Sequence, residues 1–403
     1  MKIVFVNRFF YPDHSATSQL LSDLVFGLAR SGYEIVVLTG RQVYDQPVTS
    51  LLNYEILGGA QIYRMWTTHF GRQNLLGRTV DYFTFYFSAA WYLLTMLKSG
   101  DLVVAKTDPP LISVVVALMA KIRGADLINW IQDLFPEIAM ALEVRGVRIV
   151  GPLLKSFRNW SLVMAKFNIV LGTRMAQRLL DEHIPQNKIR LIHNWADGDE
   201  IRPLESGAIP LRLEWGLRDK FVVGYSGNMG RAHEFETILS TAEVLSQVEN
   251  VVFLFIGNGA RQAWIMREVD KRGLNNVVFR PYQPREQLKF SLGVPDVHLI
   301  SLHPYLEGLI VPSKFYGVAA AGRPMIFIGD TDGEIPRLLK DSESGWTVLA
   351  GDVASLEIYI RDLAKCPAKA WQAGFRARQL FDKRYSKALA LAQWDEVLGQ
   401  VAR

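Results

Sequence analysis

The sequence predicts an α/β protein built from two parallel-sheet domains. Its 403 residues exceed what one compact core usually holds and fit two domains of ordinary size. Each half also opens with the same unit, an apolar strand followed by a loop, a helical pattern and a second strand. The opening strands are Lys2–Asn7 and Phe221–Ser226. Such repeated units favour doubly wound, Rossmann-like sheets with helices on both faces.

Further short apolar runs continue each half as buried strands would. They lie at 34–39, 102–105, 127–131, 169–171 and 188–192 in the first half, and at 251–256, 277–279, 297–300 and 325–328 in the second. Between the halves, Ala196–Pro210 has the weakest pattern and reads as a linker. We therefore expect domains at 1–200 and 201–375, with C-terminal helices at 376–403 packing back on the first. Two such domains facing each other across a cleft would bind ligands beyond the carboxyl ends of their strands.

Composition indicates a globular protein of a reducing compartment. Hydrophobic residues make up 49% of the chain and charged residues 21%, and Cys366 is the single cysteine. The chain opens directly into a strand without a secretory signal pattern, so a cytoplasmic location is expected. One apolar run, 82–97, has 16 residues between Asp81 and Lys98. This is short of the ~18–20 residues that span a bilayer, so the run predicts a buried or partly membrane-facing helix, with burial favoured.

The net charge of +5 is concentrated in one segment. Residues 145–178 contain seven basic residues and no acid. The apolar residues Leu153, Phe157 and Trp160 lie between the basic ones. A basic amphipathic helix with aromatic residues suits an anionic membrane surface, which predicts peripheral attachment to the inner face of the plasma membrane. An ordinary solvated helix face is the alternative. No recognised nucleic-acid motif accompanies the basic residues, so nucleic acid is not an expected partner.

The most informative segment is Gly308–Pro324. A glycine-bearing loop meets the start of a helix, with Pro312 near the first turn and Lys314 just inside, and Gly322 ends the helix before a buried strand. Free backbone N–H groups at a helix start, with a lysine beside them, form an anion site, and phosphate is the expected anion. Taken alone, the segment also fits a helix with a glycine stop and no ligand.

The pattern Pro-Ser-Lys-x-Tyr-x-x-x-Ala-Ala-Gly-Arg-Pro at 312–324 resembles the donor-binding segment of a known enzyme family. The family is the bacterial retaining glycosyltransferases of the GT-B "glycosyltransferase group 1" (GT4), in the branch that builds capsule, exopolysaccharide and O-antigen. The resemblance implies transfer of a sugar from a nucleoside-diphosphate sugar, bound by the second domain, to a lipid-linked saccharide acceptor bound by the first. It implies these donor-binding residues: Gly308, Leu309, Ile310, Val311 and Ser313, with Lys314 catalytic.

A second glycine loop, Ser226–His233, follows the first strand of the second half. Its glycines let the backbone approach a ligand, and Arg231 supplies a planar donor fork suited to phosphate, although the loop lacks the dinucleotide G-x-G-x-x-G pattern. The resemblance implies that Gly227, Asn228 and Gly230 flank the nucleotide diphosphate and that Arg231 and Lys314 neutralise it as it leaves. A surface arginine is the alternative for Arg231.

Such electrostatic catalysis needs no metal and no cofactor. Asp330-Thr-Asp332 superficially matches the Asp-x-Asp metal motif of the other glycosyltransferase fold, but it follows a strand in a chain of two Rossmann-like domains, so we expect no metal there.

Three further positions in the second half are implied by the resemblance. Tyr282 is a candidate to border the nucleobase, and Glu334 a candidate donor contact whose alternative is a helix-capping acid. Many relatives carry two glutamates separated by seven residues, but Gly317 stands at the second position and Glu307 is ten residues upstream of it. Glu307 is expected to face the sugar as a catalytic acid, while the two-glutamate argument itself does not transfer.

Polar side chains at strand ends of the first half are candidate acceptor contacts. Gln132 and Asp133 follow one strand, where many relatives carry a His-Asp or His-Glu pair, and Asp133 is expected to orient or deprotonate an acceptor hydroxyl. Its alternative role is capping the helix that begins near Pro136. Asp13 and His14 lie in the loop after the first strand, and Asp108 lies in a Pro-rich turn. The alternative for His14 is a solvated residue, as a lone loop histidine usually is.

Two competing functions remain open on the sequence. A GT-B sugar-nucleotide epimerase would share the cleft, but it would need more carboxylates and would turn over the donor without an acceptor. A non-catalytic membrane-surface scaffold is the other alternative, and Gly317 gives it some support. Turnover of the donor without an acceptor would indicate the epimerase, and the absence of nucleotide binding or of turnover would indicate the scaffold.

Overall fold

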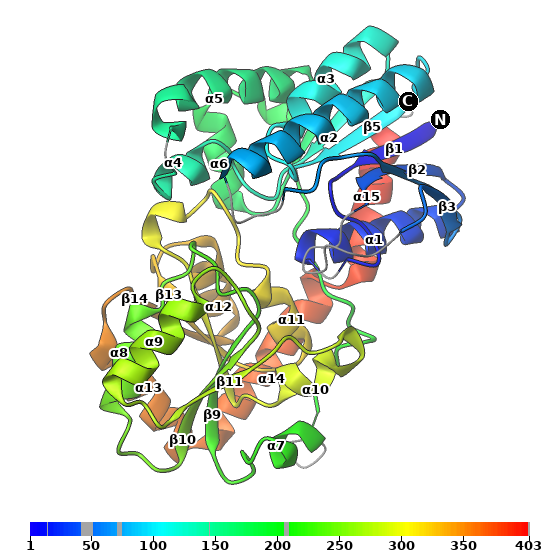
Figure 1. The fold of residues 1–403 in the computed structure, drawn as a ribbon. Helices are drawn as coiled ribbons and strands as arrows, with labels where there is room; N and C mark the ends of the chain where they lie inside the picture. The colour runs from blue at the N-terminus through cyan, green and yellow to red at the C-terminus, as the bar shows by residue number, and fades with distance from the viewer. Residues whose placement is uncertain (14, 42–50, 71–74, 145, 205–208, 402–403) are drawn as a thin grey trace. The chain divides into compact units, whose positions relative to one another are not determined.

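The computed structural model describes residues 1–13, 15–41, 51–70, 75–144, 146–204 and 209–401. The chain divides into two compact units: Met1–His193 with Ala390–Arg403, and Asn194–Leu389 (Figure 1). The expected boundary at residue 200 thus lies at residue 193. The expected return at 376 begins only at 390, because α14 (Pro367–Arg384) belongs to the second unit.

The first unit contains an eight-stranded sheet in the order β3-β4-β2-β1-β5-β6-β7-β8, parallel except for β3 against β4. Its strands are β1 (Lys2–Val6), β2 (Glu34–Gly40), β3 (Tyr54–Leu57), β4 (Ala60–Met65), β5 (Leu102–Lys106), β6 (Asp126–Trp130), β7 (Phe167–Val170) and β8 (Ile189–Leu191). The predicted strands of this half are confirmed. β3 and β4 were not predicted, because polar residues interrupt their apolar pattern.

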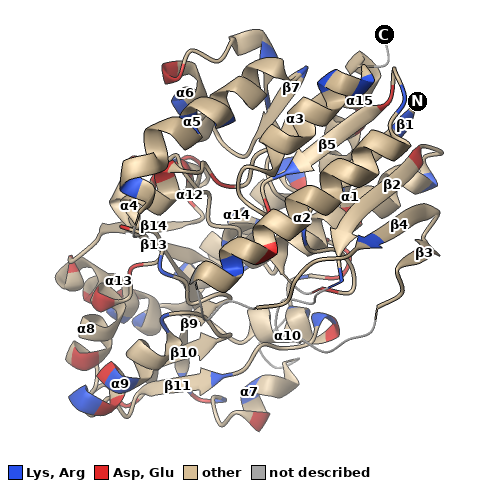
Figure 2. Ribbon diagram, turned by 45° about the horizontal axis from the view of Figure 1, so that its top comes forward, with Lys and Arg blue, Asp and Glu red and all other residues tan. Residues whose placement is uncertain are grey.

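Helices cover both faces of this sheet, as the predicted architecture requires. They are α1 (Ala16–Arg30), α2 (Leu75–Met96), α3 (Ile112–Arg123), α4 (Glu137–Ala141), α5 (Val147–Met164), α6 (Thr173–Asp181) and the unit's part of α15 (Lys387–Val401). α2 and α3 cover one face through Phe85, Leu93 and Val116. On α15, Trp394 packs edge-on against Trp130 at 5.0 Å between ring centroids. α3 packs against both α2 and α5, and the three lie side by side (Figures 1 and 2).

The expectation for the run 82–97 is corrected in one respect. The helix begins at Leu75, and only one of its faces is buried. Phe85, Ala89 and Leu93 enter the core, whereas Phe83 and Phe87 are exposed. Within the described part of the chain, no helix combines the length and hydrophobicity of a membrane-spanning segment.

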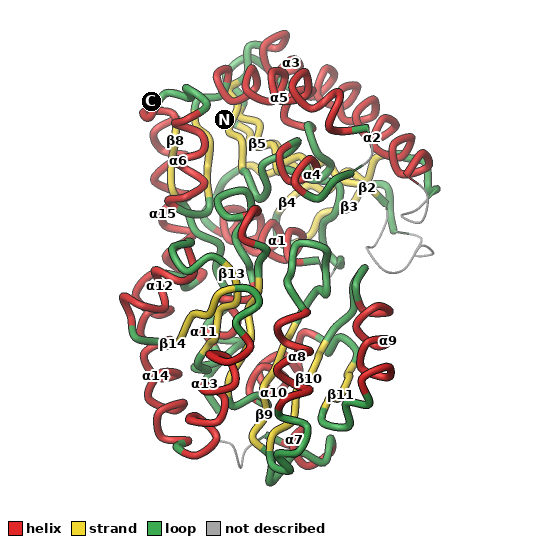
Figure 3. Tube along the Cα trace, turned by 90° about the vertical axis from the view of Figure 1, so that its left-hand side faces the viewer, coloured by secondary structure: helices red, strands yellow, loops and turns green. Residues whose placement is uncertain are grey.

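The second unit contains a six-stranded, fully parallel sheet in the order β11-β10-β9-β12-β13-β14. In Figure 3, β13 and β14 lie on the left of this unit and β10 and β11 on the right. Its strands are β9 (Phe221–Ser226), β10 (Val251–Ile256), β11 (Val277–Arg280), β12 (Val297–Ser301), β13 (Met325–Gly329) and β14 (Gly345–Leu349). Both faces of β10 are buried: Phe253 and Phe255 enter one core cluster, and Val252 and Leu254 enter another. This is why its sequence is a continuous apolar run.

The helices of this unit fill both sides of the sheet. They are α7 (Pro210–Glu214), α8 (Glu236–Val244), α9 (Gln262–Arg272), α10 (Leu288–Gly293), α11 (Lys314–Ala320), α12 (Glu334–Ser342), α13 (Val353–Lys365) and α14. α8, α9 and α13 share one core cluster with the sheet. Because the strands are parallel, the loops that follow β9, β10 and β12 lie at the same carboxyl edge of the sheet. The loop after β12 leads to the start of α11 at that edge.

Candidate functional site

Three glycines fix the loops that follow β9 and β10. Gly257 has φ +130°, and a Cβ added to it would lie 2.3 Å from the Gly227 carbonyl oxygen. Gly259 has φ +157°, and a Cβ added to it would lie 2.5 Å from the Met229 carbonyl oxygen. A side chain at either position is thus excluded by backbone. Gly227 has φ +119°, and its Cα faces the Lys314 side chain, whose Cε would lie 3.1 Å from an added Cβ. The two glycine loops are therefore packed backbone to backbone beside Lys314.

Lys314 is held entirely by neutral groups. Its Nζ donates to the Asn228 carbonyl oxygen at 3.2 Å, lies 3.1 Å from His233 Nε2, and stands 4.6 Å from the centre of the Tyr225 ring. None of the ion pairs found among the described residues includes it. Burial lowers the pKa of Lys314 to about 7. An ammonium in such surroundings gains most from an anion that binds beside it.

His233 keeps one tautomer that supports Lys314. Its Nδ1 lies 2.6 Å from the Ser301 carbonyl oxygen, which can only accept, so Nδ1 carries the proton. Nε2 is then an acceptor for the Lys314 ammonium. Burial, and next the charge of Lys314, lower the pKa of His233 to about 3, so the ring is neutral at physiological pH. His233 was not predicted as a site residue, although it ends the glycine loop identified in the sequence.

The other predicted members of the loop belong to the turn whose Asn228 carbonyl oxygen accepts from Lys314. Asn228 and Arg231 are exposed, and Arg231 forms no ion pair with a described residue. Gly230 accepts from the His233 N–H at 3.3 Å and closes the turn that carries the ring. Tyr282 lies across the neighbouring turn: its hydroxyl is 3.4 Å from the Asn258 carbonyl oxygen, and its ring borders Gly257. The structure therefore brings the predicted Gly227–Arg231 loop, Tyr282 and Lys314 together.

The segment that leads into α11 follows the predicted loop-to-helix pattern. Gly308 has φ +77°, Leu309 and Val311 are buried, Ile310 is half-buried, and Ser313 stands at the N-cap. Lys314 is the first residue of the helix, which runs to Ala320, and Gly322 follows at φ +64°. This backbone gives Lys314 its fixed position opposite the β9 loop.

Glu307 accepts a hydrogen bond that the sequence did not indicate. Its Oε1 accepts the backbone N–H of Glu334 at 2.8 Å, at the first residue of α12. Glu307 thus caps the helix for which Glu334 was the candidate cap. Glu334 itself is buried and lies near Tyr316 and Tyr385. Burial raises the pKa of both tyrosines, and the charge of Glu334 adds to that increase. Gly317, in α11, would place an added Cβ at ordinary contact distance, 3.4 Å, from Leu292.

The predicted residues of the first unit meet at neighbouring strand ends. Asp13 follows β1, Asp108 follows β5, and Gln132 and Asp133 follow β6, and these three strands are adjacent in the sheet. Asp13 is buried and its Oδ1 accepts the Ser15 N–H at 2.8 Å, one residue before α1. Gln132 is also buried, and its backbone N–H bonds the Thr107 hydroxyl at 3.2 Å. His14 lies outside the described residues.

Asp133 has the most perturbed carboxyl of this cluster. Burial, and next the charge of Asp108, raise its pKa to about 6. The helix after it, α4, begins at Glu137 with Pro136 at the N-cap, so Asp133 does not occupy the capping position that was its alternative. A carboxylate with this pKa changes protonation near neutral pH, as a general base does.

Lys106, missed by the sequence analysis, is the last residue of β5. It is fully buried, donates to the Thr17 carbonyl oxygen at 2.8 Å, and lies 3.5 Å above the Trp130 ring. Burial holds its pKa well below the usual range. Its only signal in the sequence is a lysine that ends an apolar run.

The basic segment 145–178 is less free than its sequence indicates. Lys155 pairs with Glu182, Arg158 with Glu137, and Lys166 with Asp126. The acids come from outside the segment, so its charge excess is compensated in part by the fold. Arg145 lies outside the described residues.

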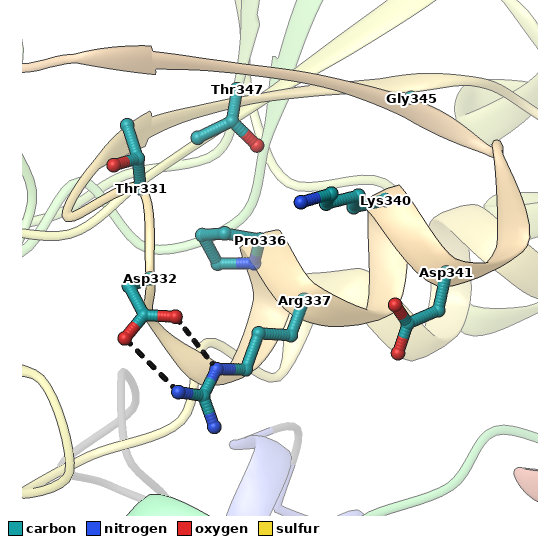
Figure 4. A pocket seen from close by; sticks show the side chains of 8 residues that line it. All are labelled: Thr331, Asp332, Pro336, Arg337, Lys340, Asp341, Gly345 and Thr347. Carbon is teal, nitrogen blue, oxygen red and sulfur yellow. Dashed lines mark hydrogen bonds and ion pairs between the residues drawn. The ribbon is translucent and has the colours of Figure 1, made fainter.

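One open pocket of about 520 Å³ lies between α12, the loop that precedes it and β14 (Figure 4). Its lining residues are Thr331, Asp332, Pro336, Arg337, Lys340, Asp341, Gly345 and Thr347. The pocket includes none of the predicted donor residues, and Arg337 pairs with Asp332 at 2.9 Å. Asp332 is therefore engaged by a cation of the chain. The described residues hold no cluster of three or more His, Cys, Asp or Glu side chains that fits a metal ion.

Two α/β units with parallel sheets are the architecture of the GT-B fold. Residues 17–195 match the family model described as a glycosyl transferase 4-like domain, and residues 212–380 match that of the glycosyl transferases group 1. The chain belongs to the group 1 glycosyltransferases, as its sequence resemblance implied, and it is a glycosyltransferase of the GT-B fold.

Named proteins show the same relationship. The chain is 26% identical to the probable glycosyltransferase WbjE of Pseudomonas aeruginosa over 309 residues, which cover 75% of each protein. It is 22% identical to WcaI of Escherichia coli (strain K12), over 84% of this chain and 86% of WcaI. WcaI is described as a putative colanic acid biosynthesis glycosyl transferase. Anabaena HepE in complex with UDP-glucose has a TM-score of 0.74 at 14% identity, over 99% of this chain and all of HepE.

Proposed function

We propose that this protein transfers a sugar, with retention of anomeric configuration, from a nucleoside-diphosphate sugar to a lipid-linked saccharide acceptor in bacterial surface-polysaccharide biosynthesis. The observation that carries the proposal is the Lys314 ammonium, which only neutral groups hold between the two glycine loops. A diphosphate would supply the missing negative charge. HepE, a protein of similar fold, binds UDP-glucose, and WcaI is named for the biosynthesis of a polysaccharide.

In this proposal the chain's own cations stabilise the leaving group. When the bond between the sugar and the diphosphate breaks, negative charge grows on the diphosphate oxygens, and Lys314 with exposed Arg231 would stabilise it. His233 holds the Lys314 ammonium by accepting from it at 3.1 Å, which reduces the reorganisation needed during the reaction. Since fixed cations play this part, we propose that the reaction needs no metal, and turnover should persist in EDTA.

Asp133 would act on the acceptor. With its pKa raised to about 6, its carboxylate is largely ionised at pH 7 and can orient an acceptor hydroxyl or take its proton. Asp108 contributes the second negative charge at the same edge of the sheet. Asp13 and Gln132 are the remaining proposed acceptor contacts, from the loops after β1 and β6.

The first test is the thermal midpoint of the purified protein with UDP, GDP, ADP, dTDP or CMP. A nucleotide at 100 times its dissociation constant adds about 2.7 kcal/mol of stability, which raises the midpoint of a unit of this size by about 5–10 °C. The shift should disappear in Lys314→Ala. It should persist in Lys340→Ala, a matched exposed lysine on α12 outside the donor loops.

A protein that no nucleotide stabilises, or that is stabilised equally when Lys314 is alanine, would contradict the proposed donor site. The nucleotide that stabilises the protein then defines the donor for a turnover assay with polyprenyl-diphosphate-linked saccharides. Consumption of donor without acceptor would favour an epimerase. The anomeric coupling constant of the product tests retention directly.

A further inference from the structure

A row of exposed apolar side chains runs along the whole length of α2. Its members are Leu76, Val80, Phe83, Phe87, Trp91 and Leu94, spaced by three or four residues so that they share one helix face. Phe83, Phe87 and Trp91 are 65%, 73% and 62% exposed. The opposite face of α2 is buried in the core through Phe85, Ala89 and Leu93. A large aromatic row facing water on one helix is unusual for a surface without a partner.

The neighbouring helices extend this row into a surface, which we call the α2 face. α3 packs beside α2 and exposes Leu118 and Ile122. α5 packs beside α3 and exposes Ile149, Leu153 and Phe157. The three helices form one layer over the sheet (Figures 1 and 2). Their exposed apolar residues therefore lie on the outer side of that layer.

The charge of the α2 face has a single sign. The three helices contain the basic residues Arg78, Lys121, Arg123, Arg148, Lys155 and Arg158. Their one acid, Asp81, is fully buried, pairs with Arg8 and accepts the Phe70 N–H. Lys155 and Arg158 are neutralised by Glu137 and Glu182, whereas Lys121 and Arg148 are exposed and pair with no described acid. The surface that α2, α3 and α5 present is thus apolar, aromatic and basic.

We propose that the α2 face docks on the surface of an anionic lipid bilayer, with α2 lying along the interface. Phe and Trp side chains enter the boundary between headgroups and acyl chains, and Lys and Arg attract anionic headgroups. A protein partner would need acidic groups of its own to meet Lys121 and Arg148, while a bilayer of anionic lipid supplies them continuously. This inference goes beyond the proposed transfer reaction, and it centres the contact on α2, with α5 of the segment 145–178 at its margin.

The test is sedimentation of the full chain with vesicles of phosphatidylcholine containing 30% phosphatidylglycerol. The variant Phe87→Ser/Trp91→Ser removes two aromatic side chains from the row. The partition coefficient should fall by about 10- to 100-fold, given the transfer free energies of buried aromatic side chains. Lys121→Glu/Arg148→Glu should lower it by about tenfold or more and reduce its dependence on salt.

Matched controls come from another exposed aromatic pair. Trp371 and Phe375 on α14 are stacked at 5.8 Å between ring centroids and are also exposed. Trp371→Ser/Phe375→Ser removes the same amount of aromatic surface and should leave vesicle binding unchanged. Circular dichroism and the thermal midpoint confirm that each variant is folded. The charge-reversal variant, which removes no apolar contact, tests the proposal if the serine variant fails to fold.

Three results would overturn the proposal. One is a wild-type chain that stays in the supernatant with anionic vesicles. Another is equal binding by the α2 and α14 serine variants. The third is a wild-type dimer that Phe87→Ser/Trp91→Ser makes monomeric without any vesicle binding, which would make the α2 face a contact between two copies. Because no donor or acceptor is present, these results are independent of the transfer reaction.

Discussion

The two units place opposite charges at the same edge of similar sheets. In the second unit, Lys314 and Arg231 stand beside the loops after β9 and β10, and the lysine has only neutral partners. In the first unit, Asp108 follows β5 and Asp133 follows β6, and the pKa of Asp133 is raised to about 6. The parallel sheet determines where the loop residues meet, and the amino acids in the loops determine the charge at that edge. One architecture thus presents basic residues in one unit and acidic residues in the other, as the proposed transfer from a diphosphate to a hydroxyl requires.

The largest expected effect comes from removing the cation of the second unit. Lys314→Met should lower kcat/KM by about 10³-fold, near 4 kcal/mol of transition-state stabilisation, since one preorganised charged donor supplies that order of magnitude. Steady-state kinetics with donor and acceptor measures it. Lys340→Met is the matched control and should keep wild-type rates. A fall of less than tenfold in Lys314→Met would show that this charge is not used in the reaction.

The acidic site should give a smaller effect with a pH signature. Asp133→Asn should lower kcat/KM by about 10²-fold, at the lower end of what general bases contribute. In the wild type, kcat/KM should rise with pH through about 6, because the protonated carboxyl cannot accept a proton, and it should fall again above about pH 7 as Lys314 loses its charge.

Asp108→Asn sharpens this prediction. Removing the neighbouring charge should move the rise to lower pH, because that charge helps to raise the pKa of Asp133. The profile is measured from pH 4.5 to 8. If Asp133→Asn retains full activity, or if Asp108→Asn leaves the profile in place, Asp133 does not act as the base.

The glycine loops of the second unit should be intolerant of any side chain. Gly257→Ala places a Cβ on a backbone with φ +130° and 2.3 Å from the Gly227 carbonyl oxygen. We expect a loss of about 2 kcal/mol or more in the free energy of unfolding and a thermal midpoint about 4–8 °C lower.

Gly317→Ala is the matched control within α11. An added Cβ there meets only Leu292, at 3.4 Å, and alanine is the better helix former, so this variant should gain up to about 0.5–1 kcal/mol. Urea unfolding of both variants measures the difference. Equal stability of the two would mean that the β10 turn relaxes without cost.

The smallest effect is the pH dependence of nucleotide binding. With a pKa of about 7, Lys314 loses its proton above that pH in the free protein, while a bound diphosphate favours the charged form. Affinity is therefore highest below pH 7 and should fall by up to about tenfold per pH unit above it, about 1.4 kcal/mol.

Calorimetric titration from pH 7 to 9 checks this expectation. Lys314→Arg, whose guanidinium stays charged, should bind with an affinity that is nearly independent of pH. His233, whose pKa is lowered to about 3, does not titrate in this range. A flat profile for the wild-type protein would show that the nucleotide does not depend on the Lys314 charge.

Sequence patterns predicted most of the fold and part of the site. Strand–loop–helix repeats and continuous apolar runs identified both sheets, because a parallel strand that is buried on both faces consists almost entirely of apolar residues. The edge strands β3 and β14, and β4 beside β3, were missed, because polar residues mix into their patterns. Lys314 and the Gly227–Arg231 loop were chosen because their segments resemble the donor-binding segments of the family, since each pattern taken alone also fits a purely structural role.

By itself, the sequence determined the two α/β units, the family to which the chain belongs and the loops that carry its polar residues, because these follow from short-range pattern and spacing. Only the tertiary structure decided how those residues are used. It joined His233 to Lys314, gave Glu307 to the start of α12, and paired the basic residues of α5 with acids from elsewhere. It also exposed one face of α2 that the sequence analysis expected to be buried. These partners lie far apart along the chain, and burial and pairing depend on which distant segments the fold brings into contact.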